Sequence, residues 1–126
     1  MKLDLYRRLG ASRTAEDVDA LRAEVRDRFG PLPAPAEAYL MVAKLRLLGG
    51  PLAVEGMLVR GDEARINFRA DAVPRLKPLA AAFRDVQFQV DVRRVQPLSL
   101  KLTRLGGSTL LDGLVRALRT IHPDAR

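Results

Sequence analysis

The spacing of the apolar residues changes partway along the chain, and this change constrains the fold more than any other feature. From residue 3 to residue 48, apolar residues recur every three or four positions, as they do along one face of a helix. From residue 52 onward, they alternate with polar residues in short runs, as in strands with one buried face. The change falls at Gly49-Gly50-Pro51, a sequence that ends a helix. The pattern therefore predicts a helical first half followed by an antiparallel sheet.

Three helices are predicted before the change of spacing, at about 3–9, 15–29 and 35–48. The first starts abruptly, as if the chain began partway into a helix of a longer protein. The second has Thr14 as its N-cap and Asp17 as the other half of a capping box. Its apolar stripe is Val18, Leu21, Val25 and Phe29. The third is apolar on nearly every side, so we expect it to be buried at the centre of the helical half.

The second half of the chain predicts strands and helices in alternation. Strands are expected at 52–60, 63–69, 86–93 and 98–103. A helix capped by Asp71 is expected between the second and third strands, kinked or shortened by Pro78. A last helix, capped by Thr109, is expected to end at Pro123. The predicted fold is α+β in the order α-α-α-β-β-α-β-β-α, with the helical half packed on a small antiparallel sheet in a single domain, 1–126.

The composition excludes several kinds of functional site. The chain has no cysteine, which excludes disulfides and cysteine-ligated metals. Its single histidine, His122, is expected at the C-terminal end of the last helix, where a cation favours the helix dipole. The glycine-rich segment 105–109 lacks the Gly-Lys-Ser/Thr of a phosphate loop and is interpreted as a turn before a helix. The sequence thus predicts no enzyme, and no catalytic, cofactor-binding or metal-binding residues.

The charge balance leaves two classes of partner open. The net charge of +7 favours a nucleic acid. However, the 22 basic residues are spread among 15 acidic ones, without a basic block or tail. A small basic nucleic-acid-binding module is therefore the alternative interpretation, and DNA binding is expected to be weak and non-specific at most. No apolar run reaches the roughly 20 residues of a membrane span, and no signal peptide is recognised, so the cytoplasm is the expected location, with no membrane partner.

Four acidic residues gather on one side of the second helix when residues are placed about 100° apart. They are Glu16, Asp17, Glu24 and Asp27, and the residues between them on that arc, Ala20 and Ala23, are small. On a chain of net positive charge, this arc favours close approach by a basic partner surface. The alternative is structural, because the first two acids can compensate the helix dipole and Glu24 can pair with Arg28. Spacing alone leaves both interpretations open.

Three segments of the first half carry a recognisable pattern. They are Leu5–Leu9 (LYRRL), Leu21–Pro33 (LRAEVRDRFGPLP) and Ala43–Arg46 (AKLR). Together they resemble the C-terminal domain of the bacterial transcription-repair coupling factors, the Mfd family. The family pattern is a Tyr-(Lys/Arg)-Arg helix, then Glu-Leu-x-Asp-Arg-Phe-Gly-x-(Leu/Pro)-Pro, then an Ala-Lys/Arg-Leu-Arg helix. The chain departs from it at Val25, where the family has Leu, and at Gly49-Gly50-Pro51, where the family often has a longer linker.

The resemblance implies a function that residue spacing does not give. Proteins of this family are ATP-driven DNA translocases that remove stalled RNA polymerase and then recruit UvrA, and their motor lies outside this domain. In them, the C-terminal domain docks on the UvrB-like module of the same protein and hides the surface that binds UvrA. The chain is thus expected to be a non-catalytic autoinhibitory domain in transcription-coupled nucleotide excision repair, with UvrA and RNA polymerase as indirect partners.

The resemblance also implies which residues make the docking contact. In the family, the contacts include the Glu and Asp of the second motif, which meet basic residues of the UvrB-like module. These match Glu24 and Asp27, both on the acidic arc. Asp17, Glu16 and Arg28 are expected beside them as further partner-binding residues. The isolated domain is expected to be a monomer.

Overall fold

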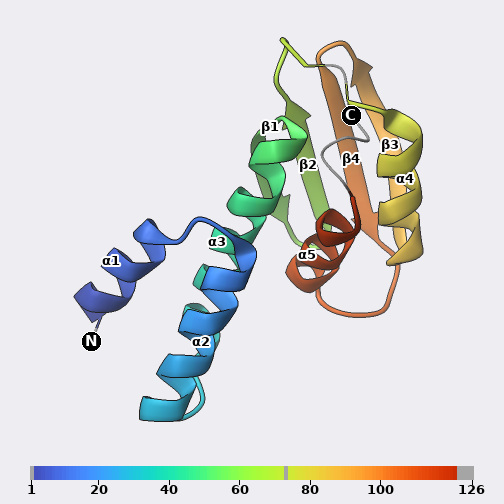
Figure 1. The fold of residues 1–126 in the computed structure, drawn as a ribbon. Helices are drawn as coiled ribbons and strands as arrows, with labels where there is room; N and C mark the ends of the chain where they lie inside the picture. Colours follow the sequence, from blue (N-terminus) through green and yellow to red (C-terminus); the bar gives the residue numbers. More distant parts are fainter. Residues whose placement is uncertain (1, 73, 122–126) are drawn as a thin grey trace. The chain divides into compact units, whose positions relative to one another are not determined.

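The two halves expected from the change of spacing are two units in the structure, a computed structural model that describes residues 2–72 and 74–121. The units are Met1–Leu48 and Gly49–Arg126, so the division falls at the glycine pair. Figure 1 shows the helices of the first unit and the sheet and helices of the second, and each unit is described by itself. The prediction that residues 1–126 form one domain stays a prediction.

The first unit consists of three helices, α1 (Lys2–Ala11), α2 (Ala15–Phe29) and α3 (Ala34–Gly49). α2 begins as predicted, because the Thr14 hydroxyl accepts a hydrogen bond from the Asp17 backbone N–H at 3.1 Å. The Asp17 carboxylate accepts one from the Thr14 backbone N–H, also at 3.1 Å, which completes the capping box. The chain leaves the helix at Gly30, whose φ of 83° favours glycine.

The core of the first unit is aliphatic and draws on all three helices. Its buried residues are Leu5, Leu9, Val18, Leu21, Val25 and Leu40. Two expectations about this core are wrong. Phe29, expected on the buried stripe, is 59% exposed, because α2 ends there and no described element of this unit covers its tip. Tyr39 and Val42 of α3, expected to be buried, are 50% and 41% exposed, because the other two helices cover only part of α3.

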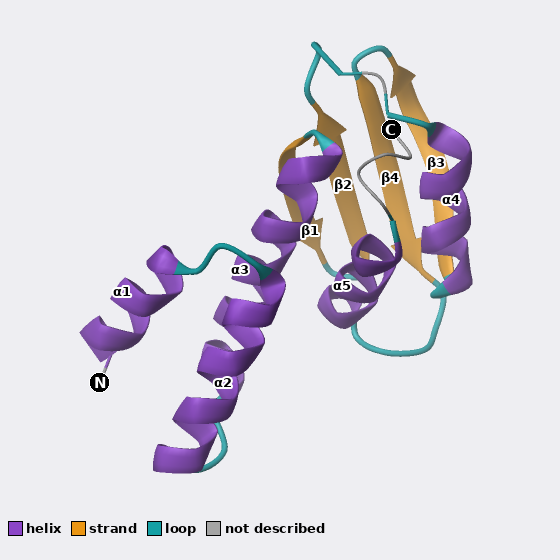
Figure 2. Cartoon of the chain, in the orientation of Figure 1, coloured by secondary structure: helices purple, strands orange, loops and turns teal. Residues whose placement is uncertain are grey.

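The second unit begins with a short 3-10 turn, η1 (Gly50–Leu52), followed by a four-stranded antiparallel sheet and two helices. The strands are β1 (Val54–Arg60), β2 (Glu63–Phe68), β3 (Phe88–Val95) and β4 (Leu98–Arg104), in the spatial order β1-β2-β4-β3. The helices α4 (Leu76–Asp85) and α5 (Leu110–Thr120) lie over the same face of the sheet (Figure 2). Gly61, with a φ of 61°, forms the predicted hairpin turn between β1 and β2.

Side-chain alternation gives the sheet one covered and one polar face. On the covered face, Ile66 of β2 pairs with Leu100 of β4, and both are fully buried. Phe83 of α4 packs over this face, edge to face with Phe88 of β3 at a ring-centroid distance of 6.2 Å. On the opposite face, the cross-strand partners of β2 and β4 are polar or charged. The core of this unit therefore lies between the sheet and its two helices.

The helix between β2 and β3 begins later than predicted. Its N-cap is Arg75, so Asp71 does not cap it and instead forms an ion pair with Arg69 at 3.3 Å. Pro78 is expected to kink or shorten this helix, and the helix is short, Leu76–Asp85. Pro78 then falls in its first turn, where the missing backbone N–H costs no hydrogen bond and no kink is needed.

The last helix begins as predicted, because the Thr109 hydroxyl accepts a hydrogen bond from the Asp112 backbone N–H at 3.3 Å. His122 and Pro123, expected at its end, lie outside the described residues. The order of helices and strands confirms the predicted α+β fold. Across the ranges 2–72 and 74–121, no helix has the length and apolar character that a membrane crossing requires.

Candidate functional site

Charged side chains join α2 to α3 along one side. Arg22 Nε donates to both carboxylate oxygens of Glu37, at 3.0 and 2.8 Å, and this hydrogen bonding raises the pKa of Arg22. Lys44 Nζ of α3 donates to the Asp19 carboxylate of α2 at 2.8 Å. This side of α2 is therefore occupied by α3 and its charges are paired.

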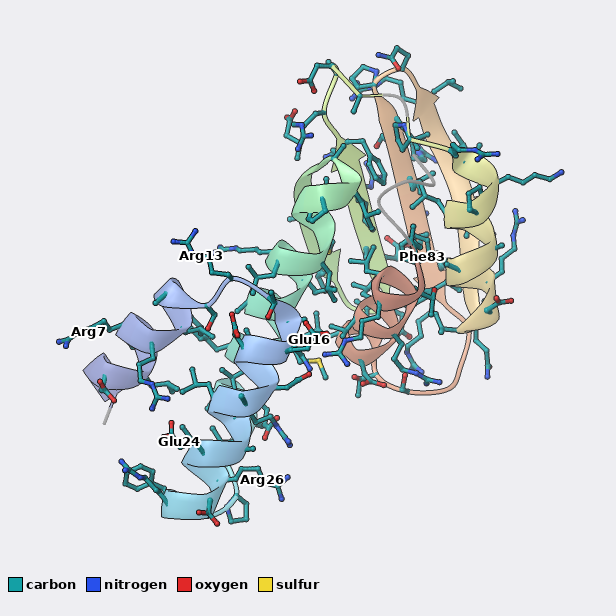
Figure 3. The ribbon with its side chains drawn as sticks, viewed as in Figure 1. Arg7, Arg13, Glu16, Glu24, Arg26 and Phe83 are labelled. Carbon is teal, nitrogen blue, oxygen red and sulfur yellow. The ribbon has the colours of Figure 1, made fainter. Side chains whose placement is uncertain are left out.

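Glu24 lies on the other side of α2, towards α1. Its Oε2 atom is enclosed and forms an ion pair with Arg8 of α1. The Glu24 side chain as a whole is 41% exposed. In Figure 3, Glu24 and Arg26 extend from opposite sides of α2. The expected pairing of Glu24 with Arg28 is not the one formed, because Arg8 supplies the cation from the neighbouring helix.

Asp17 has an internal role at the start of α2. The backbone N–H groups of Arg13 and Thr14 donate to its Oδ2 atom at 2.9 and 3.1 Å. These hydrogen bonds favour the charged carboxylate and so hold the pKa of Asp17 below its usual value. The hydrogen bond from Arg13 contributes most. Asp17 therefore fixes the beginning of α2, while its contact with a partner stays a prediction.

The two remaining acids of the predicted arc have no partner among the described residues. Glu16 and Asp27 are exposed, and neither forms an ion pair or hydrogen bond with any residue that the structure describes. Ala20 and Ala23, also exposed, lie between them. The spacing i, i+4, i+7, i+11 places all four residues on one strip of the helix. We call this strip the open face of α2.

A groove lies beside the open face, between α1 and α2. It has a volume of about 490 Å³. Asp17, Ala20 and Glu24 line it from α2, and Arg8 lines it from α1. The predicted acidic arc therefore consists of two pairs. Asp17 and Glu24 line the groove and have partners within the first unit. Glu16 and Asp27 are exposed and have no partner among the described residues.

Arg28, the fifth predicted site residue, is exposed near the end of α2, where it lines a second hollow of about 310 Å³ together with Phe29. Sequence reasoning missed Arg8, which neutralises part of the acidic arc, although Arg8 lies within the LYRRL segment. It also missed that Tyr6 and Tyr39 pair, with ring centroids 5.1 Å apart on the surface. A single sequence carries no signal that pairs residues so far apart.

The arrangement is suited to contact with another macromolecule. Among the described residues, no group of three histidine, cysteine, aspartate or glutamate side chains could hold a metal ion. What α2 presents instead is an exposed strip with a carboxylate near each end and small side chains between them. Such a strip can lie close against a surface that carries basic groups.

Comparison with known proteins identifies related sequences. The family model of the TRCF domain matches residues 1–78. The transcription-repair-coupling factor of Haemophilus influenzae is 41% identical over 72 residues, which are 57% of this chain and 6% of that protein. The corresponding protein of Mycobacterium tuberculosis is 46% identical over 48 residues, 38% of this chain and 4% of that protein. That of Helicobacter pylori J99 is 24% identical over 102 residues, 75% of this chain and 10% of that protein. The chain thus spans a tenth or less of the length of these relatives.

The fold also has a solved counterpart. A crystal structure of the C-terminal domain of transcription-repair coupling factor matches with a TM-score of 0.78 and 14% identity, covering 94% of this chain and 77% of that one. At this identity the likeness concerns the fold alone. The sequence matches and the shared fold together confirm the predicted resemblance. Because the family model covers well over half of its residues, the chain belongs to the TRCF domain family.

Proposed function

We propose that this chain is a non-catalytic regulatory domain that docks on the UvrB-like module of a transcription-repair coupling factor and masks the surface that binds UvrA. Two findings support the proposal: membership of the TRCF domain family and the open face of α2. The parent protein acts on DNA in the cytoplasm, and RNA polymerase is an indirect partner of this domain.

The observation that carries the proposal is that two acidic residues of α2 are unpaired among the described residues while the others are engaged. Three of its acidic residues, Asp17, Asp19 and Glu24, are engaged within the first unit. Glu16 and Asp27 have no partner among the described residues, although the chain as a whole carries a net charge of +7. Unpaired acids on a basic chain are available to a basic surface from outside, and that is the surface the family's docking contact requires.

Small side chains make the open face suited to close contact. Ala20 and Ala23 lie between the two free acids, so an opposing surface can come near the helix backbone. Close approach shortens the distance between opposite charges, and it also removes water, which strengthens their attraction. The open face therefore suits a partner that carries basic groups and can approach the helix closely.

Glu24 differs from Asp27, although both match the family's docking motif. Arg8 already neutralises part of the Glu24 carboxylate, so a basic partner group binds it only by sharing it with Arg8. Asp27 has no such competitor among the described residues. We therefore expect Asp27 to contribute more to docking than Glu24.

The size of the effect depends on where the charges lie in the interface. A parent protein that is about 99% closed at rest is held by about 2.7 kcal/mol. Loss of one partner from a buried charge pair costs about 2–5 kcal/mol, whereas an exposed pair at the rim contributes about 0.2–1 kcal/mol. Reversal of both Glu16 and Asp27 replaces attraction by repulsion and should therefore weaken docking in either position.

The test measures binding of the 126-residue chain to the separate UvrB-like module of the parent protein. Glu16→Arg with Asp27→Arg should weaken the affinity by about tenfold or more. The matched control, Glu55→Arg with Asp85→Arg, makes the same change in net charge on exposed acids of the second unit and should change it by less than about twofold. Thermal melts check that both variants fold. Equal losses in the two variants, or no binding by the unmodified chain, would overturn the proposal.

A further inference from the structure

A groove in the second unit has an aliphatic floor and a basic rim. It lies between α4 and the edge strand β3 and has a volume of about 350 Å³. Its lining residues are Leu76, Lys77, Ala80, Arg84, Val90 and Val92. Leu76 and Val92 are 38% and 43% exposed, so the floor is open to solvent. We call it the α4–β3 groove.

The two cations of the rim have no partner among the residues that the structure describes. Lys77 and Arg84 are seven positions apart on α4, which places them on one side of the helix and about 10 Å apart along its axis. Neither forms an ion pair or hydrogen bond within the part of the chain that the structure describes. In the same unit, Arg69, Lys101 and Arg104 all pair with acidic side chains. Arg65 and Arg116 of this unit are also unpaired among the described residues, but unlike them Lys77 and Arg84 line an aliphatic groove.

The strand side of the groove adds apolar surface without adding negative charge. β3 is an edge strand, with β4 on one side only among the described strands. Val90 and Val92 face the groove, whereas Asp91 between them pairs in register with Lys101 and points to the opposite face of the sheet. Asp85, next to Arg84 on α4, does not line the groove. The described residues of the lining thus offer aliphatic contacts and positive charge alone.

We propose that the α4–β3 groove docks an acidic segment of a partner protein in which aliphatic side chains lie between carboxylates. The aliphatic side chains cover the floor, and the carboxylates meet Lys77 and Arg84. A nucleic acid fits this groove less well, because its lining includes no aromatic side chain on which a base could stack. Four of the six lining residues lie beyond residues 1–78, which the family model matches. The groove belongs to the second unit and shares no residue with the open face of α2, so the proposal does not depend on that face.

The test titrates the 126-residue chain into a fluorescein-labelled synthetic peptide in which two leucines lie between pairs of glutamates. Amide chemical shifts of the chain are recorded in parallel. We expect saturable binding, with the largest shifts in α4 and β3. Replacing the leucines of the peptide by serine should weaken binding by about tenfold, because the floor then gains no apolar contact.

Substitutions on the chain locate the contact. Lys77→Glu with Arg84→Glu should weaken binding by about tenfold or more. The matched control, Arg65→Glu with Arg116→Glu, makes the same change in net charge on exposed residues that do not line the groove, and should weaken it by less than about threefold. Absence of saturable binding, or equal weakening by the two variants, would overturn the proposal. So would duplex DNA that displaces the peptide and depends equally on Lys77 and Arg84, since the groove would then be a nucleic-acid site.

Discussion

The core of the second unit lies between a sheet and two helices, whereas the core of the first unit is formed by three helices alone. Phe83, Leu100 and Leu114 of the second unit are fully buried. In the first unit, both tyrosines of the chain are exposed, and ion pairs join α2 to α1 and α3. Charge follows the same division: thirteen of the 22 basic and eight of the 15 acidic residues lie at 49–126, which gives this unit five of the seven net positive charges.

The difference suggests separate tasks for the two units. The first has a small core and exposes Phe29, Tyr39 and Val42 on its helices, whereas the second exposes Leu58 and Val95 on its edge strands. Surfaces of this kind are costly to leave in water and are common where another protein binds. The second has a closely packed core, which makes it a rigid body on which a groove can keep its shape. Substitutions confined to one unit test whether the two units differ in this way.

The largest effect is expected from a charge placed in the core of the first unit. Val25 is 7% exposed, and Val25→Asp should destabilise this unit by more than about 4 kcal/mol because it buries an unpaired carboxylate. Both tyrosines lie in this unit and the chain has no tryptophan, so tyrosine fluorescence reports its unfolding. Ala23→Asp, two positions earlier on the open face, is the control and should leave the melt nearly unchanged. If the two substitutions lower the melting temperature equally, Val25 is not a core residue.

A smaller effect, of opposite sign in the two units, is expected when glycine is replaced by alanine within a helix. A Cβ atom at Gly113 of α5 would lie 2.9 Å from the buried ring of Phe88, so Gly113→Ala should destabilise the second unit by about 1–3 kcal/mol. A Cβ atom at Gly10 of α1 meets nothing within 4 Å, so Gly10→Ala should stabilise the first unit by about 0.5–1 kcal/mol.

Amide hydrogen exchange measures the stability change of each variant in the unit that carries its substitution. Protection should fall in β3 and α5 of Gly113→Ala and should rise in α1 of Gly10→Ala. Stabilisation by Gly113→Ala would show that Phe88 has room to move and would contradict close packing of the second unit.

The smallest effect is expected from acidification of the helix start. Backbone hydrogen bonds hold the pKa of Asp17 below its ordinary value of 3.8. Its stabilising contribution is therefore present above about pH 3.8 and is lost as the pH falls through the lower pKa of the folded chain. The melting temperature of the first unit, followed by tyrosine fluorescence, should fall less steeply below this pH in Asp17→Asn than in the unmodified chain. Glu16→Gln, next to it on α2, should follow the unmodified chain, and an identical fall in all three would contradict the assigned role of Asp17.

Local signals made much of the fold predictable from the sequence. Thr14 with Asp17, and Thr109 with Asp112, act within one helical turn, so their residue types are enough to place two helix starts. Gly61 identifies the hairpin in the same way. The element order follows from such signals and from the two hydrophobic periods, because neither depends on residues distant in the sequence.

What the sequence could not give depends on neighbours in space. Phe29 fits the periodicity of α2, but no residue type shows that the helix extends beyond its cover. The acidic arc was visible from spacing, yet its division into engaged and free acids depends on Arg8, sixteen positions before Glu24 and on another helix. For the same reason, the α4–β3 groove has no sequence signature, since its two sides come from a helix and an edge strand.

The proposed function requires that the open face of α2 holds the parent protein closed. It is tested most directly by UvrA binding to the full-length parent, without RNA polymerase, carrying Glu16→Arg with Asp27→Arg. The account predicts that UvrA binding rises well above the resting level, because repulsion at the face removes the roughly 2.7 kcal/mol that a 99% closed population requires. UvrA binding that stays at the resting level, while the melt of the 126-residue chain with both substitutions is unchanged, would contradict it.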